Sequence, residues 1–429
     1  MAGTCVVGLQ WGDEAKGKIV DLLSGEHQFA VRYNGGANAG HTVVWGNRTF
    51  RLSLLPTGVL HPHLQAVIGN GVVVYPPRFV EEVNQLIEGG VRVGDNLVIS
   101  DHAHVIFPYH LEEEKLIESG GSSNAIGTTG RGIGPCYQDK VSRVYGIRVG
   151  DLLKPDFLRE RLEFIVPRKN KLIHAFNPSV TPFDPQQVCD QYSAFAEKLR
   201  PHVRNTTKLL QDGLNAGKRM LFEAAQGSLL DIDHGTFPYV TSSSTLPSGI
   251  WAGSGISTRK IDRIIGVIKA YTSRVGRGPF PTELDDGPDG LGERIRKIGR
   301  EYGTVTGRPR RVGWLDAVAL RYTSTLADVN EVTFMLLDVL SGLDELFICT
   351  AYEYRGERTS DFPSDADDLA ACKPIYERLA GWHEDISTAR AWADLPSNAQ
   401  RYVERVSELL QLRVSYVSVG PDRAQTIIR

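Results

Sequence analysis

Residues 12–18 read Gly-Asp-Glu-Ala-Lys-Gly-Lys and have the spacing of a phosphate-binding loop. In the pattern G-x-x-x-x-G-K-[ST], backbone N–H groups surround phosphates, the lysine neutralises them and the hydroxyl group holds Mg²⁺. The two glycines and the second lysine match, but Ile19 stands at the hydroxyl position and cannot bind a metal. Asp13 is the expected substitute, because Mg²⁺ takes oxygen ligands and is often held by one carboxylate. The loop therefore predicts chemistry on a nucleotide as well as nucleotide binding.

The residues around this loop have the order that a phosphate site requires. An apolar run at Cys5–Gly8 predicts a buried strand before the loop, and Lys18–Leu23 predicts a helix after it. Phosphate is then expected at the N-terminus of that helix, where backbone N–H groups have no partner within the helix. The alternative is an ordinary glycine turn with a surface charge cluster, which the strand–loop–helix order disfavours.

Short apolar runs along the chain predict further strands, and their continuous character is typical of a parallel sheet covered on both faces. They are Ala66–Ile68, Leu97–Ile99, Met220–Phe222, Ile264–Ile268, Thr333–Leu337, Leu346–Thr350 and Arg413–Val419. Amphipathic helices are expected at Pro77–Gly89 and Asn398–Leu412. This alternation predicts an α/β fold with a large, mostly parallel central sheet and flanking helices. We expect one domain over residues 1–429, with a helical insertion around 151–219.

The composition of the 429 residues excludes several classes of protein. A net charge of −3 gives no support to a nucleic-acid or membrane-surface partner. The sequence shows neither a signal peptide nor an 18-residue uncharged apolar run, so we expect no membrane span. The five cysteines are scattered and form no C-x-x-C pair, which disfavours a zinc site or a disulfide framework. We therefore expect a cytoplasmic protein.

A second cluster covers residues 33–42, Tyr-Asn-Gly-Gly-Ala-Asn-Ala-Gly-His-Thr. Its small residues allow a ligand to approach the backbone closely, and Asn38 and Thr42 supply hydrogen bonds. His41 can exchange a proton near neutral pH. A lone histidine is more often structural than catalytic, but its place in a Gly/Asn loop near the first cluster favours a functional role.

Two further clusters suit anions. Residues 127–135, Gly-Thr-Thr-Gly-Arg-Gly-Ile-Gly-Pro, combine hydroxyl groups, glycines and an arginine, and Arg143 follows. Residues 303–311 read Gly-Thr-Val-Thr-Gly-Arg-Pro-Arg-Arg, and arginine binds carboxylates and phosphates through paired hydrogen bonds. A pair of flexible turns and a solvated basic face are the respective alternatives.

The remaining clusters are less specific. Residues 222–227 read Phe-Glu-Ala-Ala-Gln-Gly, and the following Asp231, Asp233 and His234 could suggest a metal site. We favour capping and structural hydrogen bonds for these three, because no pattern of further ligands stands out. Asp338, at the end of a predicted strand, can accept hydrogen bonds from a base such as guanine, although a helix or turn cap is the simpler interpretation.

Taken together, these clusters resemble the adenylosuccinate synthetase family from residue 5 to Gly420-Pro421-Asp422-Arg423. The resemblance is carried by Q-W-G-D-E-x-K-G-K, N-A-G-H-T, G-T-T-G-R-G-I-G-P and T-G-R-x-R-R-x-G-W. It implies a fold related to P-loop nucleotide hydrolases and a homodimer as the working unit. It also implies the ligation of IMP and L-aspartate, with GTP and Mg²⁺, to adenylosuccinate, GDP and phosphate through 6-phosphoryl-IMP, a step of AMP synthesis.

The resemblance implies roles for individual residues. Asp13 is similar to the base that removes the N1 proton of IMP, and Asp13 and the Gly40 carbonyl resemble the metal ligands. His41 resembles the acid toward the migrating phosphate, with Gln226 assisting at the 6-oxygen of IMP. Arg143 resembles a residue that reaches IMP in the partner subunit's site.

The implied binding sets overlap. For GTP they are Gly12, Asp13, Glu14, Ala15, Lys16, Gly17, Lys18, Gly40, His41, Thr42, Arg310, Leu336, Leu337, Asp338, Ser418, Val419 and Gly420. For IMP they are Asp13, Glu14, Ala15, Lys16, Asn38, Ala39, Gly40, His41, Thr129, Arg143, Gln226, Thr241 and Arg308. For L-aspartate they are Thr304, Val305, Thr306, Gly307, Arg308, Pro309 and Arg310.

The sequence departs from the commoner family pattern at four positions. Ala15 and Ala224 stand where glycine is usual, Leu336 where lysine is usual, and Val419 where threonine is usual. Two other classes of function are weighed against the enzyme. A regulatory GTPase switch is disfavoured by Ile19 and by the additional anion clusters. An inactive binding homologue is disfavoured by the presence of Asp13, His41 and Arg308 together.

Overall fold

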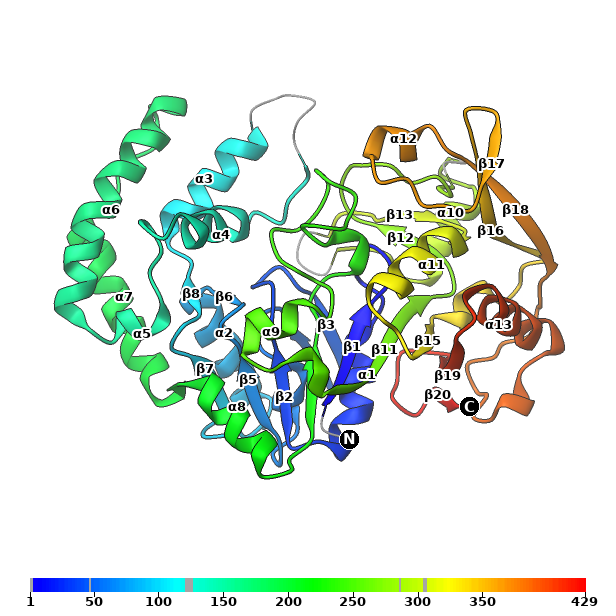
Figure 1. Cartoon of the computed structure of the whole chain (residues 1–429), viewed down its shortest axis with the longest axis horizontal. Coiled ribbons are helices and arrows are strands. Elements are labelled where there is room, and N and C mark those ends of the chain that lie inside the picture. Colours follow the sequence, from blue (N-terminus) through cyan, green and yellow to red (C-terminus); the bar gives the residue numbers. More distant parts are fainter. Residues whose placement is uncertain (1–2, 46–47, 120–125, 285–286, 304–306) are drawn as a thin grey trace.

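A ten-stranded sheet forms the centre of the described part of the chain, in the order β20-β19-β15-β11-β1-β10-β2-β5-β7-β9 (Figure 1). The computed structural model describes residues 3–45, 48–119, 126–284, 287–303 and 307–429. The strands are β1 Gly3–Gly8, β2 Phe29–Arg32, β5 Gln65–Ile68, β7 Leu97–Ser100, β9 Val203–Arg204, β10 Met220–Glu223, β11 Ile261–Lys269, β15 Glu331–Met335, β19 Arg413–Ser418 and β20 Thr426–Ile428. Only the β19–β20 pairing in this sheet is antiparallel. The predicted α/β fold with a mostly parallel sheet is confirmed.

Both faces of the central strands are buried, as their continuous apolar sequences predict. In β1, Cys5 and Val7 belong to the largest core cluster, while the intervening Val6 faces a smaller one. The large cluster includes side chains of α8 (Thr206–Asn215), α11 (Ala317–Leu326) and α13 (Ser397–Leu410). The smaller cluster is covered by α1 (Lys16–Leu23). Alternate residues of one strand thus hold helices against both faces.

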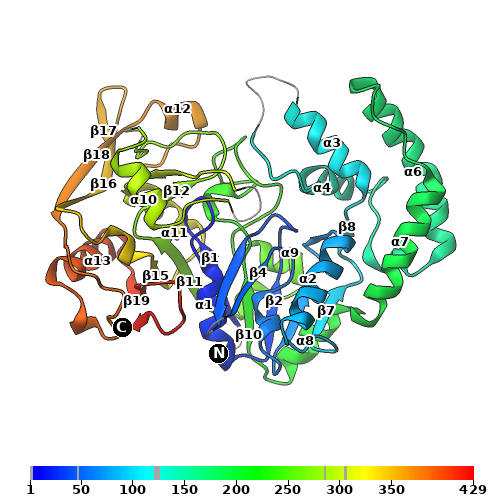
Figure 2. The same ribbon diagram turned by 180° about the vertical axis from the view of Figure 1, so that it is seen from behind.

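A second core lies at the β7 side of the sheet, where Figures 1 and 2 show a group of helices beyond the sheet edge. The helices are α2 (Pro76–Glu88), α3 (Pro108–Ser119), α4 (Ile133–Ser142), α5 (Val149–Leu152), α6 (Pro155–Phe176) and α7 (Pro185–Leu199). Four helices, α5 to α8, therefore begin and end between residues 149 and 215. The division of the chain into one domain with an insertion stays a prediction.

The smaller sheets stand apart from the main one. Strand β16 (Glu345–Tyr354) pairs with β14 (Leu315–Asp316), β17 (Glu357–Thr359) and β18 (Lys373–Ala380). The strand predicted at Leu346–Thr350 exists, but its expected place in the main parallel sheet is wrong, because β18 pairs with it in antiparallel order. The others are the hairpin β3 (His41–Trp45) with β4 (Arg48–Leu52), β6 (Val73–Val74) with β8 (His104–Val105), and β12 (Thr272–Arg274) with β13 (Arg311–Gly313).

Short helical segments complete the described chain. They are α9 (Gly249–Ser254), α10 (Leu291–Ile298) and α12 (Ala366–Ala370), with the 3₁₀ turns η1 Ser24–Glu26, η2 Thr57–Leu60, η3 Arg200–His202, η4 Ser228–Leu230, η5 Thr258–Lys260, η6 Leu337–Leu340 and η7 Trp392–Asp394. In the described ranges, no helix is both long and apolar enough to cross a membrane.

Two predicted boundaries need correction. The helix after the first loop begins at Lys16 and not at Lys18. The strand expected at Thr333–Leu337 ends at Met335, because Leu336 has a φ of 58° and turns the chain into η6. Asp338 consequently lies in a 3₁₀ turn beyond the strand. The two amphipathic helices, α2 and α13, and the other predicted strands are confirmed within a few residues.

Candidate active site

The phosphate-loop residues connect β1 to α1 in the middle of the main sheet (Figure 1). Gly12, Asp13 and Ala15 have φ values of 85°, 61° and 62°, so the loop turns through left-handed conformations. Glu14 is fully buried, and its Oε1 accepts the N–H groups of Gln10 and Gly12 at 3.0 and 2.9 Å. Lys16 Nζ lies 2.7 Å from Glu14 Oε2. The Glu14 carboxylate therefore shapes the loop from inside.

Lys18 reaches across to the end of β19. Its Nζ donates to Ser418 Oγ, the Gly420 carbonyl and the Gln425 carbonyl at 2.7, 2.8 and 3.0 Å. Burial lowers the pKa of Lys18 to about 8, although the Asp338 and Asp422 charges oppose this shift. Lys18 thus connects the phosphate loop to Ser418 and Gly420, two of the residues expected to contact guanine. Both acceptor oxygens are uncharged.

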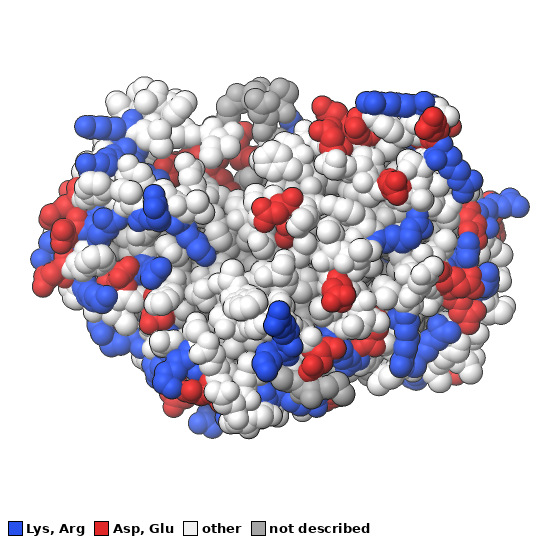
Figure 3. Space-filling model, viewed as in Figure 1, with Lys and Arg blue, Asp and Glu red and all other residues white. Residues whose placement is uncertain are grey.

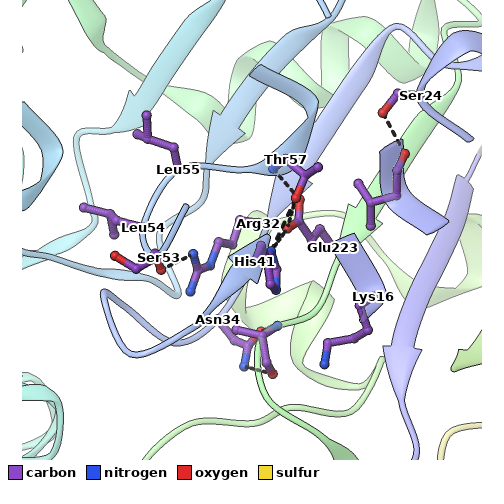
Figure 4. Close-up of polar contacts among 12 residues, drawn as sticks. Lys16, Ser24, Arg32, Asn34, His41, Ser53, Leu54, Leu55, Thr57 and Glu223 are labelled. Carbon is purple, nitrogen blue, oxygen red and sulfur yellow. Dashed lines mark hydrogen bonds and ion pairs between the residues drawn. The ribbon is translucent and has the colours of Figure 1, made fainter. Parts of the chain in front are cut away.

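His41 lies at the first position of β3 and faces Glu223 at the end of β10. His41 Nδ1 forms an ion pair with Glu223 Oε1, and Thr57 donates to the same carboxylate from its N–H and its hydroxyl group at 2.8 and 2.9 Å (Figure 4). Burial alone would raise the pKa of Glu223, but His41 and Arg32 bring it below its usual value. A Cβ placed on Gly17 would lie 3.3 Å from His41 Cβ, so His41 borders the phosphate loop.

Gln226 joins the phosphate loop, the segment 33–42 and the segment that carries Thr241. Gln226 Nε2 donates to Asn38 Oδ1 at 2.9 Å, and Asn38 Nδ2 lies 3.4 Å from Thr241 Oγ1. A Cβ on Gly12 would lie 3.6 Å from Gln226 Cα. The structure therefore brings together Gln226, Asn38 and Thr241, which were all expected to bind IMP.

The segment 127–135 contacts the segment 33–42 through α4. Tyr137 accepts the Gly35 N–H at 3.0 Å and donates to the Gly71 carbonyl at 2.6 Å. A Cβ on Gly36 would lie only 2.6 Å from Ile133 Cδ1, and a Cβ on Gly134 would lie 3.3 Å from Ser242 Oγ. The glycines thus allow close packing of these loops.

Arg310 links the arginine loop to Asp13. Its Nε lies 2.9 Å from Asp13 Oδ2, and its Nη1 donates to Glu301 Oε2 at 2.7 Å. Glu301 is buried and also accepts from Lys269 Nζ and the Tyr271 hydroxyl group at 2.6 and 2.5 Å. Burial alone would lower the pKa of Arg310, but the two carboxylates raise it. A deep ionic network therefore fixes Arg310 against the expected base.

Two buried acceptor atoms of the site have no hydrogen-bond partner. They are Gln226 Oε1 and Asp338 Oδ1. Burial raises the pKa of Asp338, with the Lys18 charge opposing it. Buried polar atoms are rarely left unsatisfied in a folded protein. Asp338 Oδ1 is an acceptor on the residue where guanine was expected to donate, and Gln226 Oε1 belongs to the residue expected beside the 6-oxygen of IMP.

Several expected site residues are not brought together. Arg143 ends α4 on the exposed surface, with φ 65°, and Arg308 is also exposed. Thr304, Val305 and Thr306 lie outside the described residues, and for Thr42 only the backbone is described. Asp231 has the predicted structural role, because it accepts the N–H groups of Asp233, His234, Thr245 and Leu246.

Sequence reasoning missed Arg32, Thr57, Glu223 and Glu301. Glu223 lay inside a quoted cluster, and the signal that could have found it is a carboxylate at the end of a buried strand. The other three carried no local signal, since their partners are distant in sequence.

The side chains beside the phosphate loop suit one Mg²⁺ ion whose other ligands come from a nucleotide. Among the described ranges, no group of three or more His, Cys, Asp or Glu side chains is placed to hold a metal ion. Asp13 is 27% exposed and offers one carboxylate beside the phosphate loop. Mg²⁺ is commonly bound by one or two carboxylates together with phosphate oxygens and water. Asp13 therefore fits the ion.

Charged side chains on one face of the molecule are intermixed. On the face in Figure 3, the described Lys and Arg side chains lie among Asp and Glu around the rim, and the centre is mostly uncharged. A nucleic-acid surface would be expected to gather positive charge on one face.

Comparison with known proteins identifies the family. The model of the adenylosuccinate synthetase family matches residues 5–427. The chain belongs to the adenylosuccinate synthetase family. It is 50% identical to the adenylosuccinate synthetases of Streptococcus gordonii and Streptococcus sanguinis, over the whole chain and 98% of each relative. As a member of the family, the protein is an enzyme, a ligase of purine biosynthesis.

Solved structures agree with this assignment. A fully ligated adenylosuccinate synthetase from Plasmodium falciparum superposes with a TM-score of 0.93 at 36% identity, covering 99% of both chains. A succinoaminodeoxyadenylate synthetase of cyanophage S-2L, bound to dGMP and to dATP as an energy donor, has a TM-score of 0.63 at 21% identity. The second similarity concerns the fold alone.

Proposed function

We propose that this chain ligates IMP and L-aspartate to adenylosuccinate, using GTP and Mg²⁺, through 6-phosphoryl-IMP. The observation that carries the proposal is the meeting of Asp13, His41 and Gln226 at the carboxyl ends of β1, β2 and β10. In open α/β sheets, ligands bind outside these ends. Family membership supports the same reaction.

In the first step, Asp13 takes the N1 proton of IMP, which makes the 6-oxygen nucleophilic. That oxygen attacks the γ-phosphorus of GTP, so the O6–P bond forms and the P–O bond to GDP breaks. His41 donates to the migrating phosphoryl group, and Gln226 assists at the 6-oxygen. Bound Mg²⁺ would neutralise phosphate charge. Arg310 Nε lies 2.9 Å from Asp13 Oδ2, so this base is paired with a guanidinium through one of its two oxygens.

In the second step, the aspartate amine attacks C6 and phosphate leaves with the 6-oxygen. The C–N bond forms, the C6–O bond breaks, and the nitrogen loses its proton. Phosphorylation is required because the 6-oxygen alone is a poor leaving group. Arg308 and Arg310 suit the two carboxylates of aspartate, since arginine binds carboxylates through paired hydrogen bonds. The loop 304–310 would place them.

The remaining assignments are proposals of the same kind. Lys16, Asn38, Thr129 and Thr241 would contact IMP, and Asp338, Ser418 and Gly420 would contact guanine. We also propose a cytoplasmic homodimer in which Arg143, exposed at the end of α4, reaches the partner's IMP.

The test supplies GTP, Mg²⁺, IMP and L-aspartate to the purified protein and omits each in turn. Adenylosuccinate should form only when all four are present. The Asp13→Ala variant should lose at least about 10³-fold in kcat, because the base and a metal ligand are both removed. Hydrolysis of GTP that ignores IMP and aspartate would contradict the proposal and support a GTPase switch. Binding without turnover would support a binding protein.

A further inference from the structure

Glu223 is a fully buried carboxylate at the carboxyl end of β10, between β1 and β2. It accepts two hydrogen bonds from Thr57, and its Oε1 faces His41 Nδ1 at hydrogen-bond distance. Burying a charge is costly unless it is paired and hydrogen-bonded. Every contact named here lies on the side of Glu223 that faces η2 and β3, the segments that carry Thr57 and His41.

The surroundings keep this carboxylate ionised. Arg32, which is also fully buried, lies beside it in Figure 4 and donates to the carbonyls of Ser53 and Gly36 at 2.7 and 2.6 Å. The Arg32 charge and the His41 contact bring the pKa of Glu223 below its usual range in spite of burial. An ionised carboxylate only accepts hydrogen bonds, so the His41 nitrogen that faces it must carry a proton.

We propose that Glu223 is a positioning residue that holds His41 with its proton on Nδ1 and directs Nε2 to the migrating phosphoryl group. The assignment rests on the proposed function. For His41 to donate, Nε2 first takes up a proton from solvent; that proton passes to an oxygen of the phosphoryl group, and the ring returns to the neutral form with its Nδ1–H on Glu223. The same arrangement orients the histidine in Ser-His-Asp triads.

The Glu223→Gln variant tests this role through its hydrogen bonds. Glu223 Oε2 accepts the Thr57 N–H at 2.8 Å, so the glutamine carbonyl must take that position. Its NH₂ group then replaces Oε1, which faces His41 Nδ1. Because an NH₂ group only donates, neutral His41 would shift its proton to Nε2. We expect kcat to fall about 10²–10⁴-fold, as for the corresponding change in a triad, while KM for IMP and for aspartate changes less than about threefold.

A second readout does not depend on turnover. In ¹⁵N-histidine NMR spectra of the resting protein, with His41 assigned from a His41→Asn variant, the neutral ring should carry its proton on Nδ1 in the wild type. It should carry the proton on Nε2 in Glu223→Gln. An unchanged tautomer would contradict the proposal, whatever reaction the enzyme catalyses. If the wild type forms no adenylosuccinate, the proposed function fails and the NMR result still decides the role of Glu223.

Thr57→Val is the matched control. It removes the hydroxyl group that donates to Glu223 at 2.9 Å and lies 3.3 Å from His41 Nδ1, and it leaves the Glu223 carboxylate in place. We expect less than about a tenfold loss of kcat and an unchanged tautomer. A Glu223→Gln enzyme with kcat within about threefold of wild type would overturn the proposal. If Glu223→Gln does not fold, Glu223→Asp decides: a loss of at least about tenfold in kcat at unchanged KM supports positioning, and a smaller loss overturns it.

Discussion

Ala15 adopts a backbone conformation that favours glycine, with φ 62° and ψ 34° at the N-cap of α1. An L-residue in the left-handed region is strained by about 1–2 kcal/mol, because its Cβ approaches the following carbonyl. The common family pattern has glycine here. This explains why glycine is usual here, and the methyl group of Ala15, which is exposed, adds backbone strain to the loop. Leu336, another departure, has the same conformation, with φ 58°.

Ala15→Gly should therefore increase the free energy of unfolding by about 0.5–1 kcal/mol. Relief of the backbone strain stabilises the folded state, and the greater freedom of glycine in the unfolded chain offsets part of this gain. Guanidinium denaturation of both proteins measures this difference. Ala194→Gly in the exposed face of α7 is the opposite control and should decrease stability by about 1 kcal/mol. Equal effects of the two substitutions would show that the left-handed conformation of Ala15 carries no strain.

At the scale of the elements, α11 is joined to the small sheet by one buried carboxylate. Asp316 accepts the N–H groups of Val318 and Ala319 at 3.0 and 3.1 Å and the Tyr352 hydroxyl group of β16 at 2.6 Å. Burial raises the pKa of Asp316 to about 6, although these hydrogen bonds oppose the shift. Between pH 4 and 6, Asp316 is therefore protonated more often in the folded protein than in the unfolded chain.

This difference gives stability a defined pH dependence. Between pH 4 and 6 the folded protein binds more protons at Asp316 than the unfolded chain does, so its contribution to stability falls as pH rises. Since one pKa unit corresponds to about 1.4 kcal/mol, the contribution of this group is of the order of 3 kcal/mol. Asp316→Asn, which can still cap α11, should remove this term. Denaturation at pH 4, 5, 6 and 7 should show the variant gaining on the wild type as pH rises, and a pH-independent difference would contradict the assignment.

The elements also show what the sequence predicts and what it does not. Continuous apolar strands and helical periodicity predict most of the sheet, because both depend on neighbouring residues. Strand β2 was missed since it has four residues and ends in Arg32, whose burial depends on the distant Ser53 and Glu223. The sheet of β16 was assigned wrongly because its partner β18 lies some twenty residues later and is set by tertiary packing.

The same limit applies to the site. The motifs predict Asp13, His41 and Gln226 as candidates, since the loop spacing and residue types are local. No local sequence pattern indicates that Glu223 faces His41. Nor does any indicate that Glu301, which is paired with Lys269, holds Arg310. These contacts depend on how the strands are ordered in the sheet, and the sequence alone left that order open.

At the scale of the whole molecule, Arg143 lies on the surface, while Asn38, Gln226 and Thr241, three other proposed IMP contacts, lie together. In a symmetric dimer an exposed arginine on one subunit can complete the site of the other. Val141 and Val144 beside it are 77% and 49% exposed, which suits a surface that a second copy covers.

Mixing variants tests this shared site. Asp13→Ala and Arg143→Leu should each have little activity alone, the first through chemistry and the second through weak IMP binding. In a mixed dimer, one site combines an intact Asp13 with an intact Arg143. Random exchange of subunits should therefore restore about one quarter of wild-type activity. If sedimentation shows mixed dimers but activity never returns, the shared site is wrong.

The bond between Lys18 and the Gly420 carbonyl spans 402 positions of the chain. During synthesis the phosphate loop leaves the ribosome long before the segment that Lys18 contacts, because about 400 residues are translated between them. Until then Lys18 lacks its acceptors on Ser418, Gly420 and Gln425, and β15 lacks its neighbour β19. A nascent chain that stops before residue 418 would thus carry a complete phosphate-loop sequence and would lack Ser418 and Gly420, two of the proposed guanine contacts. Translation itself sets the moment at which the nucleotide site is finished.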